Sequence, residues 1–183
     1  MVFTITDVEQ VQREHPDWQV ELQDGKIVIM GPCDDISSEI GVEFSRLLAN
    51  WVRPKRLGRV YDSSGGFILP NSDLRAPDVS FVKAQRLPRS RRNFVNLVPD
   101  LAVEIKSKTD RLKPLKEKIN LYLELGTQVG ILIDPDKEML TVYRTEQDPI
   151  ILQNNDVLTL PDLFPGWELP IAELWPPVFD DEE

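Results

Sequence analysis

The sequence predicts an α/β (α+β) fold in which a mixed β-sheet is flanked by helices. Short strand-like segments recur between residues 18 and 144, and two longer segments carry apolar residues at helical spacing. The continuous apolar run VGILI at 129–133 is typical of a strand that is covered on both faces. A chain of 183 residues suits a single domain with one core, which we place at about 15–145. An acidic, proline-rich extension is expected at 146–183.

The first part of the chain predicts two helices around a hairpin. Residues 4–14 are expected to form a short helix. The stretch WQVELQDGKIVIM at 18–30 predicts two strands around Asp24-Gly25, which is a favoured hairpin turn. Residues 35–52 predict a longer helix, whose apolar stripe is formed by Ile36, Ile40, Phe44, Leu47, Leu48 and Trp51.

The middle of the chain predicts most of the sheet. Its expected strands are GRVYDSS, GFILP, APDVSFV, DLAVEIKS, VGILI and MLTVYR. The segment KAQRLPRSRRNFVNLVP is expected to be a basic loop. Residues 110–125 predict a second long helix that stops at Gly126.

The amino-acid composition argues against several classes of functional site. The single cysteine, Cys33, excludes an internal disulfide and a cysteine cluster for zinc, and the single histidine, His15, argues against a Ser-His-Asp triad. Neither a GxxxxGK[ST] loop nor a GxGxxG turn is present. No apolar run is long enough for a membrane span, and no signal pattern opens the chain, so we expect a soluble, cytoplasmic protein.

Charge is distributed unevenly along the chain. The net charge is −10, yet residues 53–118 hold 16 of the 21 basic residues and only 7 of the 31 acidic ones. That segment therefore carries +9 and the remainder −19. Such asymmetry suits a local polyanion site on an acidic body, although solvated helix faces and a basic loop would give the same count.

The segment VEIKSKTD at 103–110 contains a candidate catalytic pair. In a strand, residues i and i+2 share a face, so Glu104 and Lys106 would project together. Asp78 opens another predicted strand after Pro77. Carboxylates from two neighbouring strands can hold Mg²⁺, and a lysine beside that ion can orient water or stabilise phosphate charge.

The two-part pattern is common by itself. Five Pro-Asp pairs and two [DE]-x-Lys matches occur in this chain. Asp24 and Lys26 form the other match, but they fall in the predicted turn. Only Asp78 followed by Glu104 and Lys106 places both halves on predicted strands ahead of a helix.

The flanking motifs add a family resemblance. They are YDSSGGFILP, RAPDVSFV, PDLAVEIKSKTDRL, EKINLYLELG and ILIDPDKEMLTVYR. In this order they resemble the PD-(D/E)XK nuclease superfamily, and more closely the bacterial Uma family of restriction-endonuclease-like proteins, over about residues 15–145. The resemblance implies a restriction-endonuclease-like fold with Mg²⁺, or alternatively Mn²⁺. It makes Asp78 and Glu104 metal ligands and Lys106 the catalytic lysine.

Two further positions are candidates. Related nucleases often carry a glutamate on the first core helix, and helical geometry places Glu43 nearer the buried side than Glu39. Lys118 belongs to the family-like EK-x₃-Y pattern and can replace the strand lysine where that lysine is missing. Both lysines are present here, so their division of labour stays open, and Glu43 and Lys118 also suit plain solvated charges.

The function expected from these features is metal-dependent hydrolysis of phosphodiester bonds in DNA. The basic stretch 83–92 and the residues from Lys108 to Lys116 would contact the phosphate backbone. A homodimer would supply two active sites for double-strand cleavage. The alternatives are a nuclease acting on RNA, and a non-catalytic protein that keeps the fold for binding or assembly.

Overall fold

The computed structural model describes residues 2–179 and is organised around a six-stranded mixed sheet. The strand order is β10-β9-β8-β7-β6-β3. These strands are β3 (Gly58–Asp62), β6 (Val79–Lys83), β7 (Leu101–Ile105), β8 (Val129–Asp134), β9 (Met139–Tyr143) and β10 (Ile150–Leu152). Strands β7 and β8 are parallel and every other neighbouring pair is antiparallel. The predicted mixed sheet is therefore confirmed.

A second sheet, with the order β2-β1-β5-β4, is built around the N-terminal hairpin. Its strands are β1 (Gln19–Gln23), β2 (Lys26–Met30), β4 (Phe67–Ile68) and β5 (Leu74–Arg75), and α1 (Ile5–Glu14) packs on it. Asp24 and Gly25 have φ of 50° and 68°, the left-handed pair that a tight hairpin requires. The Ser/Gly turn after β3 leads into this second sheet, so β3 and β4 do not pair with each other.

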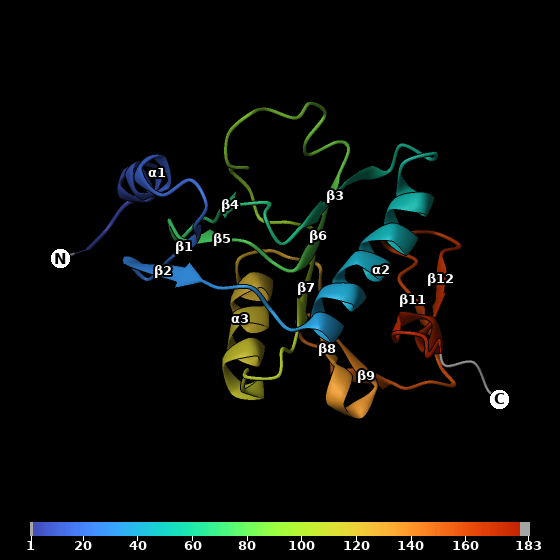
Figure 1. Cartoon of the computed structure of the whole chain (residues 1–183). Helices are drawn as coiled ribbons and strands as arrows, with labels where there is room; N and C mark the ends of the chain where they lie inside the picture. The colour runs from blue at the N-terminus through green and yellow to red at the C-terminus, as the bar shows by residue number, and fades with distance from the viewer. Residues whose placement is uncertain (1, 180–183) are drawn as a thin grey trace.

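The helices α2 (Asp35–Val52) and α3 (Leu112–Glu124) cover opposite faces of the main sheet (Figure 1). On one face, Phe44 of α2 belongs to the same buried cluster as Val103. On the other face, Tyr122 of α3 packs with Ala102. This division follows from the strand geometry, since successive residues of β7 point to opposite faces. Ile36, expected in the buried stripe of α2, is instead half exposed near the start of that helix.

The packed core continues beyond residue 145. The chain there forms β11 (Val157–Thr159), β12 (Glu168–Pro170) and a 3₁₀ turn, η2 (Ile171–Leu174), beside α2 (Figure 1). Phe164 is fully buried, with its ring centroid 4.7 Å from that of Phe81. The expected extension thus supplies part of the main core, because most of its apolar residues between 158 and 174 are buried there, whereas Ile150, Ile151 and Val157 stay exposed. Residues 180–183 lie outside the described part of the chain.

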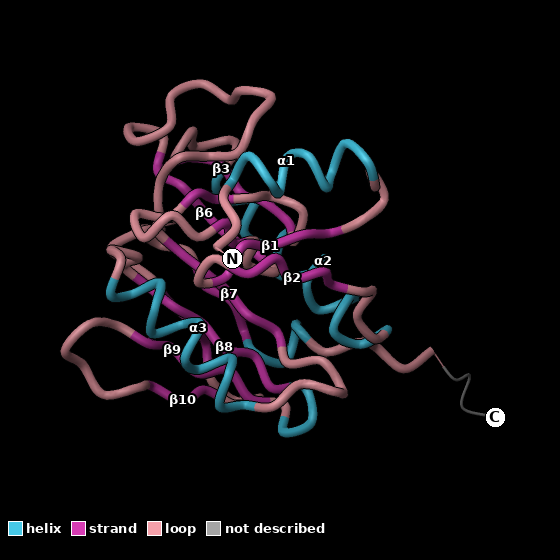
Figure 2. The backbone as a smooth tube through the Cα atoms, turned by 90° about the vertical axis from the view of Figure 1, so that its left-hand side faces the viewer, coloured by secondary structure: helices cyan, strands magenta, loops and turns pink. Residues whose placement is uncertain are grey.

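The second sheet and α3 lie on the same side of the main sheet, where the loop 84–100 also folds over (Figure 2). This loop leaves β6 and returns to β7, and a shorter 3₁₀ turn, η1 (Pro135–Lys137), joins β8 to β9. Among residues 2–179, no helix has the length and apolarity needed to cross a bilayer.

Candidate active site

The ends of β6 and β7 bring two of the expected acidic residues together. These strands are antiparallel with Val79 opposite Val103, so Asp78 and Glu104 lie at the same end of the pair. The backbone N–H of Ile105 donates to Asp78 Oδ2 at 2.7 Å, which fixes that carboxylate against the strand that carries Glu104. All five residues of β7 are buried, so neither face of the strand is wet.

Glu104 is buried beside the ammonium group of Lys118. Lys118 Nζ lies 3.0 Å from Glu104 Oε1 and donates to Oε2 at 3.0 Å. Only 2 % of Glu104 is exposed, and its Oε1 accepts no hydrogen bond from residues 2–179. A buried carboxylate oxygen of this kind has unused capacity to bind a cation or a proton.

Glu21 of β1 completes the cluster and was not among the predicted residues. Its Oε1 lies 3.4 Å from Lys118 Nζ and accepts from the backbone N–H of Ala76 at 2.8 Å. Arg75 reaches its other oxygen at 3.5 Å. Glu21 is fully buried although it alternates with Gln19 and Gln23, a pattern that reads as a solvent face. Its only sequence signal is a charged residue inside a predicted strand.

The protonation of this cluster is strongly shifted. Burial raises the pKa of Glu104 from 4.5 to about 8, and neighbouring Lys118 opposes the shift only in part. Burial likewise raises the pKa of Asp78, against the stabilising Ile105 N–H. For Lys118, burial favours the neutral amine, but Glu104, Tyr122 and Glu21 outweigh it and hold its pKa well above 10.5. Lys118 is therefore an ammonium group near neutral pH.

A groove of about 500 Å³ opens beside Asp78. Ser37, Gly41 and Arg46 of α2 line one side, and Asp62 with Ser63 lines another. Asp78 contributes to the groove directly, whereas Glu104 lies behind it under α3. Small side chains on α2 keep this approach to the acidic cluster open.

Comparison with known proteins gives a family. The sequence profile of Uma2, described as "Putative restriction endonuclease", matches residues 5–172. This chain belongs to the Uma2 family. The expected resemblance is thus confirmed, and the match covers the C-terminal segment that packs on α2 as well as the strands that carry Asp78 and Glu104.

Solved structures support the same fold for this Uma2 chain. A crystal structure of a "putative nuclease belonging to DUF820" from Anabaena variabilis has a TM-score of 0.75 and 26 % sequence identity, covering 85 % of this chain and 88 % of that one. A DrdV–DNA complex is similar only at a TM-score of 0.39 and 13 % identity, covering 59 % of this chain and 9 % of that one. No match was found among curated proteins. The family and its structural neighbour support a nuclease-like function.

Lys106 lies at the end of β7 but does not share the contacts of Glu104. Its backbone N–H continues the sheet by donating to Ile133 at 2.9 Å. Its ammonium group pairs with Asp136 of η1 at 2.6 Å, which also raises its pKa. The strand lysine is thus engaged outside the cluster, and the helix lysine, Lys118, is the one beside Glu104. Their roles stay a prediction.

Glu43 lies on α2 and pairs with Arg46, three residues further along the helix. That contact lowers its pKa. Glu43 is partly exposed and forms no hydrogen bond with Asp78 or Glu104. Its expected role as a metal ligand would require the carboxylate to leave Arg46, and it too stays a prediction.

The residues present fit a divalent cation in part. Within residues 2–179, no three acidic, histidine or cysteine side chains are grouped closely enough to hold a metal ion. Mg²⁺ nevertheless needs only one or two carboxylates, with water and substrate filling its other positions. The Oε1 of Glu104, which accepts no hydrogen bond, and the nearby Asp78 carboxylate supply that donor set in oxygen atoms alone.

Proposed function

We propose that this Uma2 protein is a metal-dependent endonuclease that hydrolyses phosphodiester bonds in DNA. The observation that carries the proposal is the buried Glu104 carboxylate, whose Oε1 accepts no hydrogen bond, held between Asp78 on the next strand and Lys118 on α3. The single ammonium group of Lys118 lies 3.0 Å from both oxygens of this carboxylate. Here Lys118 faces Glu104, Glu21 and Asp78, so the cluster carries more acid than base.

Asp78 and Glu104 are the proposed ligands of Mg²⁺ or Mn²⁺. When bound, such an ion supplies Lewis-acid activation of a phosphoryl oxygen and of water. Asp78 lies at the groove and would meet the substrate side, while Glu104 would hold the buried side. Cation binding would favour the ionised Glu104, whose pKa is otherwise raised by burial.

Lys118 is the proposed catalytic lysine, and its proposed contribution is electrostatic. Because its pKa is raised, it stays protonated and would donate hydrogen bonds rather than remove a proton from water. It would thereby position Glu104 and stabilise negative charge that develops on the phosphate. Lys106 remains the second candidate, and it would act only after leaving Asp136.

DNA is the proposed partner on grounds of charge and family. The segment 53–118, with its charge of +9, carries Asp78, Glu104 and Lys118 of the site. Backbone contacts by Lys and Arg give sequence-independent, salt-sensitive binding. A homodimer would place two such sites on one duplex, and sedimentation velocity at cleavage concentrations would measure it.

A nicking assay on supercoiled plasmid tests the proposal. Wild type should nick the plasmid in Mg²⁺ or Mn²⁺ and not in EDTA, whereas Glu104→Gln should lose at least about 100-fold in rate because an ionised ligand is removed. Glu39→Gln, the same change on an exposed part of α2, is the matched control. Equal nicking by wild type and Glu104→Gln would refute the assignment.

Two companion variants separate the lysines. Lys118→Met should abolish nicking, and Lys106→Met should leave most of it if the contacts seen here persist in the complex. Calorimetric titration with Mn²⁺ then tests the alternative that this protein is non-catalytic. Wild type should bind the ion and Asp78→Asn should not, while absence of binding in both would favour a protein that only keeps the fold.

A further inference from the structure

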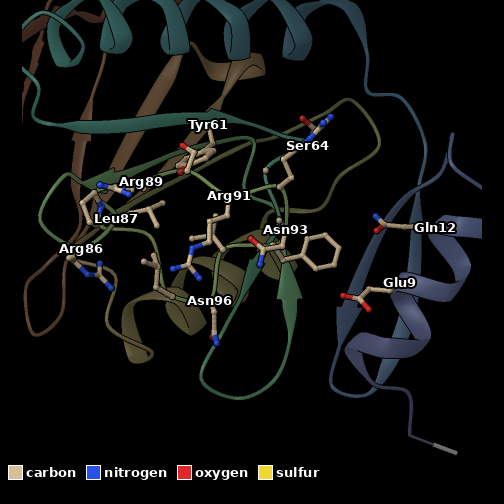
Figure 3. A pocket seen from close by; sticks show the side chains of 18 residues that line it. Glu9, Gln12, Tyr61, Ser64, Arg86, Leu87, Arg89, Arg91, Asn93 and Asn96 are labelled. Carbon is tan, nitrogen blue, oxygen red and sulfur yellow. The ribbon is translucent and has the colours of Figure 1, made fainter.

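The basic loop 84–100 borders a hollow of about 1060 Å³ (Figure 3). Arg86, Arg89, Arg91 and Arg92 line it, with Glu9 and Gln12 of α1 on the far wall. The guanidinium group of Arg86 forms an ion pair with buried Asp100, with Nη1 2.9 Å from Oδ1. The other three arginines are exposed and form no ion pair within residues 2–179.

The loop is held at both ends. On its outgoing limb, Arg59 donates to the carbonyl oxygens of Leu87 at 3.0 Å and Pro88 at 2.9 Å. On its returning limb, Val95 exchanges backbone hydrogen bonds of 2.9 Å with Gly66 and Ile68. The arginines between these anchors are therefore carried on a loop of defined path, which lowers the entropy cost of using them to bind a ligand.

This hollow and the groove at Asp78 both reach the edge strand β3, but from opposite faces of the main sheet. A third hollow of about 400 Å³ lies between them. It shares Asp62 and Ser45 with the groove at Asp78, and it shares Tyr61 with the loop hollow. Exposed Arg53 lines this middle part. The three hollows thus follow one another around the β3 edge, from the carboxylate of Asp78 to the unpaired arginines, and we call this succession the track.

The length of β6 gives a minimum scale for the track. Strand β6 separates its two ends, because Asp78 precedes the strand and the loop follows it. Its five residues span about 13 Å at a rise of about 3.3 Å per residue. Since base pairs are stacked about 3.4 Å apart, this length corresponds to about four base pairs.

We propose that one duplex DNA occupies this track, with a phosphate at Asp78 and more distant phosphates on Arg89, Arg91 and Arg92. The proposal rests on the endonuclease function given above and adds the path of the substrate. The arginine loop lies outside the acidic cluster, so it contributes affinity and register and leaves the bond-breaking step to the cluster.

Salt-dependent binding in EDTA tests the path without any cleavage. Fluorescence anisotropy of a labelled duplex of about 30 base pairs would compare wild type with Arg89→Ala/Arg91→Ala from about 50 to about 200 mM NaCl. Losing two phosphate contacts should lower the slope of log K against log salt by about 1.8. Lowering the salt fourfold would then strengthen wild-type binding about 12-fold more than that of the variant.

Two further proteins make the result specific. Lys26→Ala/Lys137→Ala removes two exposed charges away from the track and should keep the wild-type slope. Arg89→Lys/Arg91→Lys keeps both charges and should also keep the wild-type slope. That result would exclude collapse of the loop as the cause of a reduced slope in the alanine variant. Equal slopes for wild type and the alanine variant would overturn the proposal.

The salt-dependent binding experiment and the nicking assay can fail independently of each other. Nicking with an unchanged slope in the alanine variant would overturn the path alone. A reduced slope without nicking would support the path and refute the endonuclease. A reduced slope seen with an RNA duplex and not with DNA would overturn the choice of DNA.

Discussion

Replacing Glu104 with glutamine should make the stability of the folded chain less dependent on pH. Burial raises the pKa of Glu104 from 4.5 to about 8, so in the folded state this carboxyl keeps its proton where the unfolded chain has lost it. Between those two pKa values the folded state binds one proton more than the unfolded state. Wild-type stability is therefore lost as pH rises through this window.

The magnitude follows from linkage. One bound proton corresponds to about 1.4 kcal/mol per pH unit, so wild type should lose about 3 kcal/mol between about pH 5.5 and about pH 7.5 from this group alone. Glutamine resembles the protonated carboxyl and does not titrate. All other residues of the cluster are the same in both proteins, so the difference between the two free energies of unfolding reports the change at position 104.

Urea unfolding in EDTA measures this difference. The free energy of unfolding of Glu104→Gln minus that of wild type should grow by about 3 kcal/mol over those two pH units. Below about pH 4.5 the difference should level off, because both states of wild type are then protonated. Parallel pH profiles for the two proteins would show that Glu104 does not hold a raised pKa. Glu39→Gln, on the exposed side of α2, should follow wild type.

Two further predictions concern stability. Gly58→Ala should destabilise the fold by about 3 kcal/mol in urea unfolding, because the added Cβ would lie 2.1 Å from a backbone oxygen of β6. Gly31→Ala, with nothing within 4 Å, should change stability by less than about 1 kcal/mol. Asp100→Ala should also cost about 3 kcal/mol, since this fully buried carboxylate accepts from a backbone N–H at 2.8 Å and pairs with a guanidinium at 2.9 Å. Exposed Asp148→Ala is its control, and equal melting of the two aspartate variants would contradict this account.

Local patterns predicted most elements because each pattern has one strong physical cause. The helix at 35–52 was expected with the bounds that α2 has, since its buried residues recur at helical spacing. The hairpin turn at Asp24-Gly25 followed from the backbone conformations these residues tolerate. The packing of residues 158–174 into the main core was not expected, because polar and proline residues separate its apolar positions.

The candidate site was predicted only in part. Asp78 and Glu104 could be found because two short motifs place them on successive strands, and β6 does pair with β7. Glu21 could not, because its strand alternates as a solvent-facing strand does. The face of β1 that carries Glu21 is buried only in the folded chain, where α3 brings Lys118 within 3.4 Å of Glu21.

The sequence by itself determined the class of fold, the family resemblance and the exclusion of an internal disulfide or a cysteine cluster. Those properties depend on residue identity and on spacing within one element. Tertiary structure decided which lysine meets Glu104. Position i+2 on a strand predicts Lys106, but β7 ends at Ile105 and Asp136 of η1 draws that side chain away. Lys118, 14 residues further on, reaches Glu104 because α3 packs across β7, a contact that no local pattern encodes.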